Sequence, residues 1–286
     1  MATSGAVPPL LRDPTSRLVR RARRSAGRLV DEVLARHTAA QTAALRTELA
    51  ALRDTFEHRL RHEVDRAIAE VQAAEVRDRR DMIAAGEREA VLTSARFARE
   101  LMADAAMLAA PPETLAHALA RAPTGGLALE FGVYTGGTLR AIAECRGDGR
   151  VYGFDSFTGL PEPWRSGFGT GAFDDVDGLP EVPGAELVVG LFSDTLHEFL
   201  QAHPGPVDFL HVDSDLYSSA VTVLDAVGPR LRPGSVVLFD EFLNFPDWEQ
   251  HEARAWWEYA DKHGLGYSYL CYTLNNEQVA VRVESR

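Results

Sequence analysis

The sequence predicts an α/β domain with a mostly parallel, seven-stranded sheet and a terminal antiparallel hairpin, preceded by a long helix. Short β-rich runs alternate with helical periods from residue 126 onward, which favours a parallel sheet covered by helices. The last two β-rich runs flank residues 274–277, a pattern typical of a hairpin. Residues 28–110 contain no proline and one glycine, and good helix formers dominate them.

The chain divides into four expected segments. Residues 1–27 are basic, and we expect them to be flexible. We expect residues 28–85 to form a long helix or coiled coil, and residues 86–125 to form a helical lead-in. Residues 126–286 should form the α/β domain. The arginines between Arg17 and Arg28 would lie mostly on one helix face. Either a docking surface for an acidic partner or membrane, or a solvated helix start, explains them.

The long helix carries one apolar stripe, whose spacing averages about 3.7 residues. This exceeds the heptad value of about 3.5, so any supercoil should be weak or right-handed. Self-association through a coiled coil would bury the stripe and give a homo-oligomer, and packing against the globular domain is the alternative. Gly86 is the expected break. The stripe comprises Leu45, Leu49, Leu52, Phe56, Leu60, Val64, Ile68 and Val71.

Composition excludes several classes of protein. No apolar run approaches the ~20 residues of a transmembrane helix, and the N-terminus has no apolar signal core. The net charge of −12 combines about +2 in residues 1–120 with about −14 in residues 121–286, and this acidic half argues against nucleic-acid binding there. Cys145 and Cys271 form no metal-binding pattern. We therefore expect a cytoplasmic protein with reduced thiols.

The α/β segment can be assigned element by element. The expected strands are Gly126–Val133, Val151–Phe157, Glu186–Leu191, Val207–Val212, Gly234–Phe239, Leu265–Thr273 and Gln278–Val283. The expected helices are Gly136–Cys145, Asp194–His203, Leu216–Leu231 and Trp248–Lys262. Residues 158–184 hold six glycines and four prolines, and we interpret them as a lid over an acceptor.

A glycine turn follows the first strand. It lacks the Gly-x-Gly-x-x-Gly dinucleotide pattern, because Tyr134 stands where the second glycine would be. A nucleoside ligand without a pyrophosphate fits better. Glu130 ends the first strand and Asp155 the second, where nucleotide folds hold ribose hydroxyls.

Four carboxylates follow the next two strands. Asp213 and Asp215 follow one strand, and Asp240 and Glu241 follow the other, so both pairs should face the crevice at the carboxyl edge of the sheet. They would repel one another without a cation, and oxygen ligands favour magnesium or calcium. Helix capping and solvated loop acids are the alternative. His211, inside its strand, is more consistent with a core histidine, or with one that supports the residues of the site, than with a catalyst.

Four motifs occur in order along the α/β segment: Glu130–Gly137, Gly153–Pro161, Asp213–Tyr217 and Phe239–Phe242. Together they resemble the macrocin and mycinamicin sugar O-methyltransferases, which are class I, S-adenosylmethionine-dependent and magnesium-dependent enzymes of antibiotic biosynthesis. The resemblance covers about residues 90–286 and implies a Rossmann-like class I methyltransferase fold.

The resemblance also implies roles for single residues. Asp215 would be the general base, and Asp213, Asp240 and Glu241 would bind magnesium, although the family can have aspartate at the position of Glu241. Phe192 and Ser193 would flank the adenine of S-adenosylmethionine. The other expected cofactor-binding residues are Glu130, Gly132, Tyr134, Thr135, Gly136, Gly137, Thr138, Asp155, Ser156 and Asp213.

The predicted function is therefore methyl transfer from S-adenosylmethionine to a hydroxyl of a sugar or glycosylated natural product, with magnesium bound. A phenolic acceptor is an alternative. A catalytically inactive coiled-coil scaffold is another, and the intact carboxylate cluster argues against it. An NAD-dependent oxidoreductase is disfavoured by the spacing of the glycine turn.

Overall fold

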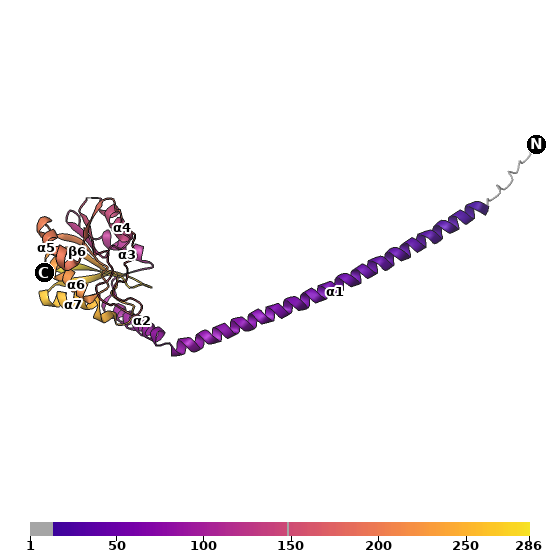
Figure 1. Ribbon diagram of the computed structural model, residues 1–286, viewed down its shortest axis with the longest axis horizontal. Helices are drawn as coiled ribbons and strands as arrows, with labels where there is room; N and C mark the ends of the chain where they lie inside the picture. Colours follow the sequence, from indigo (N-terminus) through magenta and orange to yellow (C-terminus); the bar gives the residue numbers. More distant parts are fainter. Residues whose placement is uncertain (1–13, 148) are drawn as a thin grey trace, which may run out of the picture. The chain divides into compact units, whose positions relative to one another are not determined.

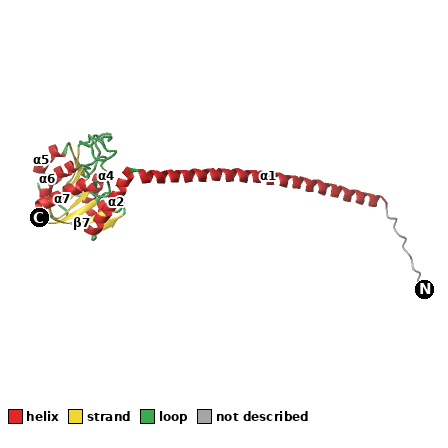
Figure 2. Cartoon of the chain, turned by 90° about the horizontal axis from the view of Figure 1, so that it is seen from below, coloured by secondary structure: helices red, strands yellow, loops and turns green. Residues whose placement is uncertain are grey.

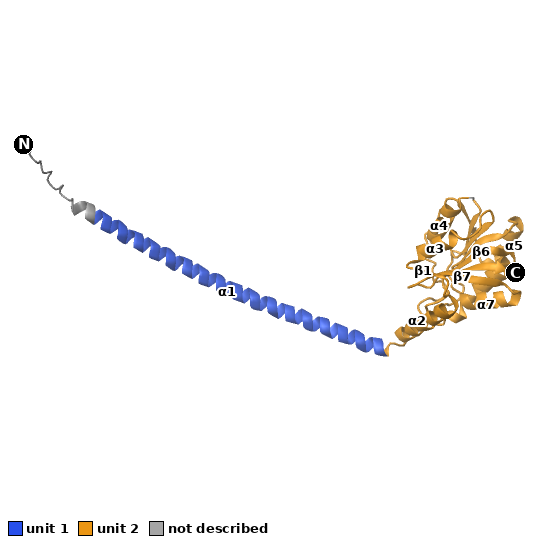
Figure 3. Ribbon diagram, turned by 180° about the vertical axis from the view of Figure 1, so that it is seen from behind, with its two compact units in different colours: residues 1–79 blue, residues 80–286 orange. Residues whose placement is uncertain are grey.

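The computed structural model describes residues 14–147 and 149–286. The chain divides into two compact units, residues 1–79 and residues 80–286 (Figure 3). Part of the expected flexible start, residues 1–13, lies outside the described residues, and the chain is helical from Pro14. In the described part of the chain, no helix is both long enough and apolar enough to cross a membrane.

The described part of the first unit belongs to the helix α1 (Pro14–Arg80), which ends at the first residue of the second unit and begins before the expected start at residue 28. Arginine–glutamate pairs four residues apart, such as Arg36 with Glu32, support it on its exposed surface. The apolar stripe is uncovered within the described chain, from 48% exposure at Val64 to 72% at Leu49.

The second helix, α2 (Met82–Leu101), starts at a side-chain cap. The carboxylate of Asp81 accepts hydrogen bonds from the backbone N–H groups of Ile83 and Ala84, at 3.0 and 3.2 Å. This satisfies two of the donors that a helix start leaves free. The break therefore lies at Asp81, and the expectation of a break at Gly86 is wrong, since Gly86 lies inside α2.

The second unit is built on an eight-stranded sheet of order β1-β7-β8-β6-β5-β2-β3-β4. Figure 1 shows strand β6 of this sheet and the helices α2 to α7 of the unit. β8 is antiparallel to both β6 and β7, and the other pairs are parallel. The strands are β1 (Ala106–Leu108), β2 (Leu127–Phe131), β3 (Val151–Asp155), β4 (Ala185–Val189), β5 (Val207–Val212), β6 (Leu231–Phe239), β7 (Gly266–Thr273) and β8 (Val279–Ser285). The helices are α3 (Pro111–Leu119), α4 (Gly137–Arg146), α5 (Phe192–Ala202), α6 (Tyr217–Val227) and α7 (Glu252–His263), with short 3-10 turns η1 (Gly228–Arg230) and η2 (Trp248–Gln250).

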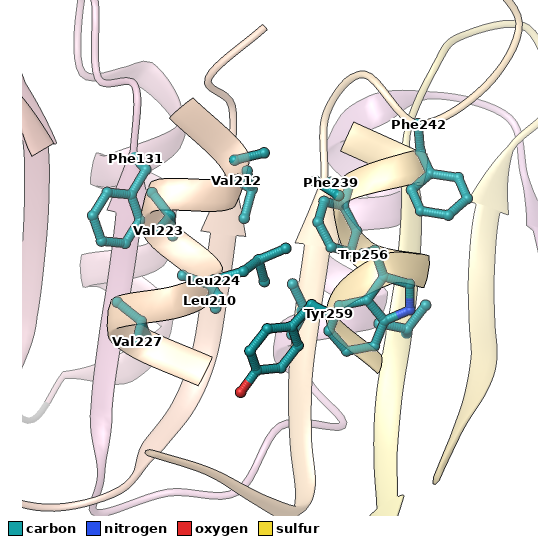
Figure 4. Packing of buried hydrophobic residues seen from close by; sticks show 14 of the residues in the cluster. Phe131, Leu210, Val212, Val223, Leu224, Val227, Phe239, Phe242, Trp256 and Tyr259 are labelled. Carbon is teal, nitrogen blue, oxygen red and sulfur yellow. The ribbon is translucent and has the colours of Figure 1, made fainter. Parts of the chain in front are cut away.

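Both faces of the sheet are buried, because successive strand residues point to opposite sides. In β2, Leu127 and Leu129 belong to a core that includes residues of α2, α5, α6 and α7, whereas Ala128 belongs to a second core under α3 and α4. Figure 4 shows side chains of α6 and α7, including Val223 and Trp256, facing strands β5 and β6. The sheet thus lies between two helical layers.

The predicted fold is confirmed, including the mostly parallel sheet and the antiparallel hairpin. The strand count differs by one, because Ala106–Leu108 pairs in parallel with β7 and adds an eighth strand. Three residues are too few to show a two-residue period, so only the tertiary pairing reveals this strand.

The carboxyl ends of the central parallel strands meet at one edge, where loops gather (Figure 2). Backbone hydrogen bonds extend the pairing by one residue: Gly132 donates to Phe154, Asp213 to Phe131 and Asp240 to Val212, each at 2.9 Å. The first residues after β2, β5 and β6 therefore lie side by side. This is the edge at which open α/β sheets bind ligands.

Candidate active site

A cavity of about 590 Å³ opens at this edge of the sheet. Its walls come from the glycine turn after β2, the end of β3, the loop before β4, the start of α5 and the acidic loops after β5 and β6. Residues that lie far apart in the sequence therefore converge on one space.

The glycine turn has a backbone that only glycine fits at one position. Gly132 has φ +97°, and a Cβ there would lie 1.7 Å from the carbonyl oxygen of Asp213. Tyr134 follows with φ +49°, an uncommon value for a side-chain-bearing residue. Strained backbone of this kind is concentrated at ligand sites.

The Asp155 carboxylate organises this turn. One of its oxygens accepts the N–H groups of Val133 and Tyr134, at 2.8 and 2.9 Å, and the other accepts the N–H of Phe157 at 2.8 Å. Asp155 also lines the cavity, so a carboxylate oxygen with one protein donor has capacity for a further hydrogen bond.

Glu130 and His211 form a buried pair below the cavity. The Nδ1 atom of His211 lies 2.9 Å from Oε1 of Glu130, and both side chains are fully buried. On the other side of the ring, Nε2 lies 3.4 Å from Oδ1 of Asp240. Burial alone would lower the pKa of His211, but these two hydrogen bonds outweigh it and raise that pKa well above its ordinary value.

His211, Asp213 and Asp240 offer ligand atoms that all lie within 4.8 Å of one another. Burial and the neighbouring Asp240 raise the pKa of Asp213 well above its ordinary value. Burial would raise the pKa of Asp240 too, but hydrogen bonds from His211 and Gln278 outweigh burial and lower it. The cluster therefore contains carboxylates that repel one another and that a cation would stabilise.

Glu241 lies beside this group but is not a member of it. Its side chain is buried, lines the cavity, and has one oxygen, Oε2, without a hydrogen-bond partner. Burial and the charges of Asp213 and Asp240 raise the pKa of Glu241 well above its ordinary value. An unpartnered buried oxygen next to two acids is a position that a bound cation would satisfy.

Asp215 lies in the cavity wall with φ +59° and is only 8% exposed. Burial raises the pKa of Asp215 to about 7, with Asp240 and Glu277 adding to the shift and Arg165 opposing it. A carboxylate with this pKa is a better proton acceptor near neutral pH than an ordinary aspartate.

The loop between β3 and β4, residues 156–184, contains no helix or strand and supplies aromatic wall residues. The guanidinium of Arg165 lies 3.9 Å from the ring centre of Trp164 and 4.9 Å from that of Phe245. Arg165 also donates to Glu277 at 2.9 Å. The loop is thus fastened to the loop after β6 and to the turn before β8.

Comparison with known proteins identifies the core of this unit. Residues 129–242 match a family model described as a methyltransferase domain. The chain carries a methyltransferase domain. The prediction that the enzyme is a methyltransferase is therefore confirmed.

The methyltransferase domain is similar to a protein of Streptomyces olivaceus named 8-demethyl-8-(2,3-dimethoxy-alpha-L-rhamnosyl)-tetracenomycin-C 4'-O-methyltransferase. The two are 31% identical over 141 residues, which cover 40% of this chain and 52% of the relative. The chain thus matches about half the length of this relative.

Two solved structures are also similar to the methyltransferase domain. The calicheamicin methyltransferase CalS11 is 24% identical, with a TM-score of 0.49, over 60% of this chain and 76% of that one. The mycinamycin-pathway methyltransferase MycE, in complex with Mg and SAH, is 18% identical, with a TM-score of 0.41, over 61% of this chain and 49% of that one.

The methyltransferase domain brings most of the expected site residues together. The cavity is lined by Gly132, Tyr134, Asp155, Ser156, Phe192, Ser193, Asp213, Asp215 and Glu241. The remaining expected residues do not line it: Glu130, Thr135, Gly136, Gly137, Thr138 and Asp240. Glu130 is fully buried beneath the cavity, and Gly137 and Thr138 begin α4.

Three residues that act on the acids or on their loops were not predicted from the sequence. Gln278 donates to Asp240, Arg165 lies near Asp215, and Glu252 accepts hydrogen bonds from Ser214 and Glu241. Burial raises the pKa of Glu252 well above its ordinary value, and the two backbone donors oppose that shift. No sequence pattern marks these residues, because each reaches the site through tertiary contacts.

Proposed function

We propose that the protein is an S-adenosylmethionine-dependent and magnesium-dependent O-methyltransferase, acting on a hydroxyl of a sugar or glycosylated natural product. The observation that carries this proposal is the meeting of a glycine turn with the acids Asp213, Asp215 and Glu241 in one cavity of a methyltransferase domain. Asp240 lies outside the cavity wall but has a ligand atom within 4.8 Å of one of Asp213. The Streptomyces olivaceus relative, whose name specifies a 4'-O-methyltransferase of a rhamnosyl-bearing compound, supports the sugar acceptor.

The cluster fits a divalent cation. Asp213 and Asp240 have ligand atoms within 4.8 Å of each other, and Glu241 presents an unpartnered buried oxygen beside them. Oxygen ligands of this kind are those that magnesium prefers. We assign Asp213, Asp240 and Glu241 as the holding residues, with His211 supporting Asp240. When bound, magnesium would lower the pKa of an acceptor hydroxyl.

The residues of the chain would divide the remaining tasks. Glu130 and the turn Gly132–Thr138 would shape the site for the methionine part of the donor, and Asp155 would accept from ribose hydroxyls. Phe192 and Ser193 would lie beside the adenine. The buried Glu130 would act from beneath the turn rather than from the cavity wall, since it is fully buried.

Asp215 would accept the proton of the acceptor hydroxyl. The acceptor oxygen then forms a bond to the methyl carbon while the bond from that carbon to the sulfonium sulfur breaks. The proton ends on the Asp215 carboxylate, and the donor leaves as neutral S-adenosylhomocysteine. Holding the reacting groups in line is the main contribution expected of the site. The raised pKa of Asp215 suits this role.

A methyl-transfer assay tests this function. With S-adenosylmethionine and a panel of rhamnosylated and phenolic acceptors, we expect turnover on a sugar hydroxyl that EDTA abolishes and magnesium restores. Asp240→Asn should remove turnover. Asp261→Asn, an exposed carboxylate on α7, is the matched control and should retain it.

Each alternative has its own outcome in that assay. Full activity after complete metal removal refutes the magnesium dependence. Binding of S-adenosylmethionine without turnover on any acceptor favours the inactive scaffold, and turnover on phenols alone favours a phenolic acceptor. Tight binding of NAD in calorimetry would support an oxidoreductase instead.

We also propose that the stripe on α1 makes the protein a homo-oligomer through a coiled coil. Its apolar side chains are at least 48% exposed along the described helix, and a second copy of the same stripe would bury them. Light scattering of the full chain should give a multiple of the monomer mass. Leu52→Glu with Phe56→Glu should reduce it, whereas Thr47→Glu on the opposite helix face should not. An unchanged mass in the double variant would refute the coiled coil.

A further inference from the structure

Glu252 is a buried carboxylate at the first residue of α7, with both of its oxygens in use. Oε1 accepts the backbone N–H of Ser214 at 3.2 Å and its hydroxyl at 3.3 Å. Oε2 accepts the backbone N–H of Glu241 at 3.3 Å. A single side chain therefore connects the loops that follow β5 and β6.

The two loops are those that carry the acids of the proposed metal site. Ser214 lies between Asp213 and Asp215, and Glu241 directly follows Asp240. The parent strands β5 and β6 are neighbours, and their ladder ends at the pair Val212 and Phe239. Beyond Asp240, whose N–H donates to Val212 at 2.9 Å, the described backbone bonds do not join the two loops to each other.

The partners of Glu252 differ from those of a carboxylate that only stabilises the fold. Asp208 is another fully buried carboxylate, and it lies near the amino end of β5. It pairs with the guanidinium of Arg232 at 2.6 Å. Within the described chain Glu252 has no such basic partner, although burying a carboxylate without one is unfavourable. Its donors are instead two backbone N–H groups and a hydroxyl on the acidic loops, and the amino end of α7 favours its charge.

We propose that Glu252 is the positioning residue that sets the spacing of the two acidic loops, and thereby the affinity of the site for a divalent cation. This inference rests on the proposed metal-dependent function. Glu252 lies outside the cavity wall, so it acts through Ser214 and Glu241, both of which line the cavity.

Glu252→Gln is the sharpest test because it keeps the shape of the side chain. Both oxygens of Glu252 face N–H donors, so a glutamine places its own N–H₂ group against one of them in either orientation. Calorimetry with magnesium should show affinity weaker by about 10- to 100-fold, the usual effect of losing a residue that supports metal ligands. Affinity for S-adenosylmethionine should stay within about twofold.

Two further measurements separate positioning from general destabilisation. Saturating magnesium should restore most of the kcat of Glu252→Gln, which a structural defect would not allow. Hydrogen exchange without metal should be faster at the amides of Ser214 and Glu241. The matched control is Glu249→Gln, which removes an exposed carboxylate three residues away. It should change neither the magnesium affinity nor the exchange rates of these amides.

The outcomes distinguish this inference from the function on which it rests. If the wild-type chain binds no magnesium, the metal-dependent function fails and the inference fails with it. If the wild type binds magnesium and Glu252→Gln binds it equally well, only the inference is overturned. Should Glu252→Gln not fold, Ser214→Ala removes one of the three contacts, and an unchanged magnesium affinity in that variant would equally overturn it.

Discussion

Gly132→Ala gives the most direct test of the turn geometry. The added Cβ would lie 1.7 Å from the carbonyl oxygen of Asp213, whereas real Cβ contacts are not shorter than 3.0 Å. The turn and the Asp213 loop must therefore separate by at least 1.3 Å, the difference between these two distances. The φ of +97° adds backbone strain of about 1–3 kcal/mol for a residue with a side chain.

These effects set the expected magnitudes. A loss of about 2 kcal/mol lowers the Tm of a domain of this size by about 4–8 °C. Displacement of a site residue by about 1 Å can reduce kcat/KM by about 100-fold. Thermal denaturation and the methyl-transfer assay measure the two effects separately.

The matched control is Gly137→Ala, five residues along the same segment. No atom lies within 4 Å of a Cβ added at Gly137, which is the first residue of α4. Its Tm should change by no more than about 1 °C. A Gly132→Ala variant with the Tm of the wild type and activity within threefold would refute the reasoning.

Three other predictions follow from single contacts. Burial raises the pKa of Cys271 to about 12, so near pH 10 only the unfolded chain ionises this thiol, and the stability of the fold should fall as pH rises. Between pH 7 and 10, the free energy of unfolding of the wild type should therefore drop by about 1.4 kcal/mol more than that of Cys271→Ala. Asp81→Ala removes the cap of α2 and should destabilise that helix by about 1 kcal/mol, measured as faster hydrogen exchange over residues 82–86 and refuted by unchanged rates. Arg165→Ala breaks the ion pair with Glu277 and should raise KM for the acceptor while leaving KM for S-adenosylmethionine unchanged; equal effects on both KM values would contradict a role in the acceptor wall.

The sequence was sufficient to predict the elements that have strong periodicity. The strand Val207–Val212 matches its predicted bounds, and the terminal hairpin lies where turn residues separate two β-rich runs. The convergence of Asp213 and Asp240 was also predictable, because parallel strands place their carboxyl ends at one edge.

Contacts between distant residues could not be predicted in this way. His211 meets Glu130, 81 residues earlier, and the pattern of its strand shows only that His211 is inside. The sequence likewise gives no sign of the role of Glu252, because a glutamate at a helix start usually does no more than interact favourably with the helix dipole. Only the packing of α7 brings its carboxylate to Ser214 and Glu241.

The irregular segment 156–184 has a consequence for the rate of the cycle. It forms part of the cavity wall, and Arg165 fastens it by an ion pair to Glu277, 112 residues away, and by stacking on Trp164 and Phe245. We expect exchange of product for a fresh acceptor to require these contacts to open and reform. Local opening on the microsecond-to-millisecond scale would then limit turnover, and higher solvent viscosity would slow it even when the chemistry is fast.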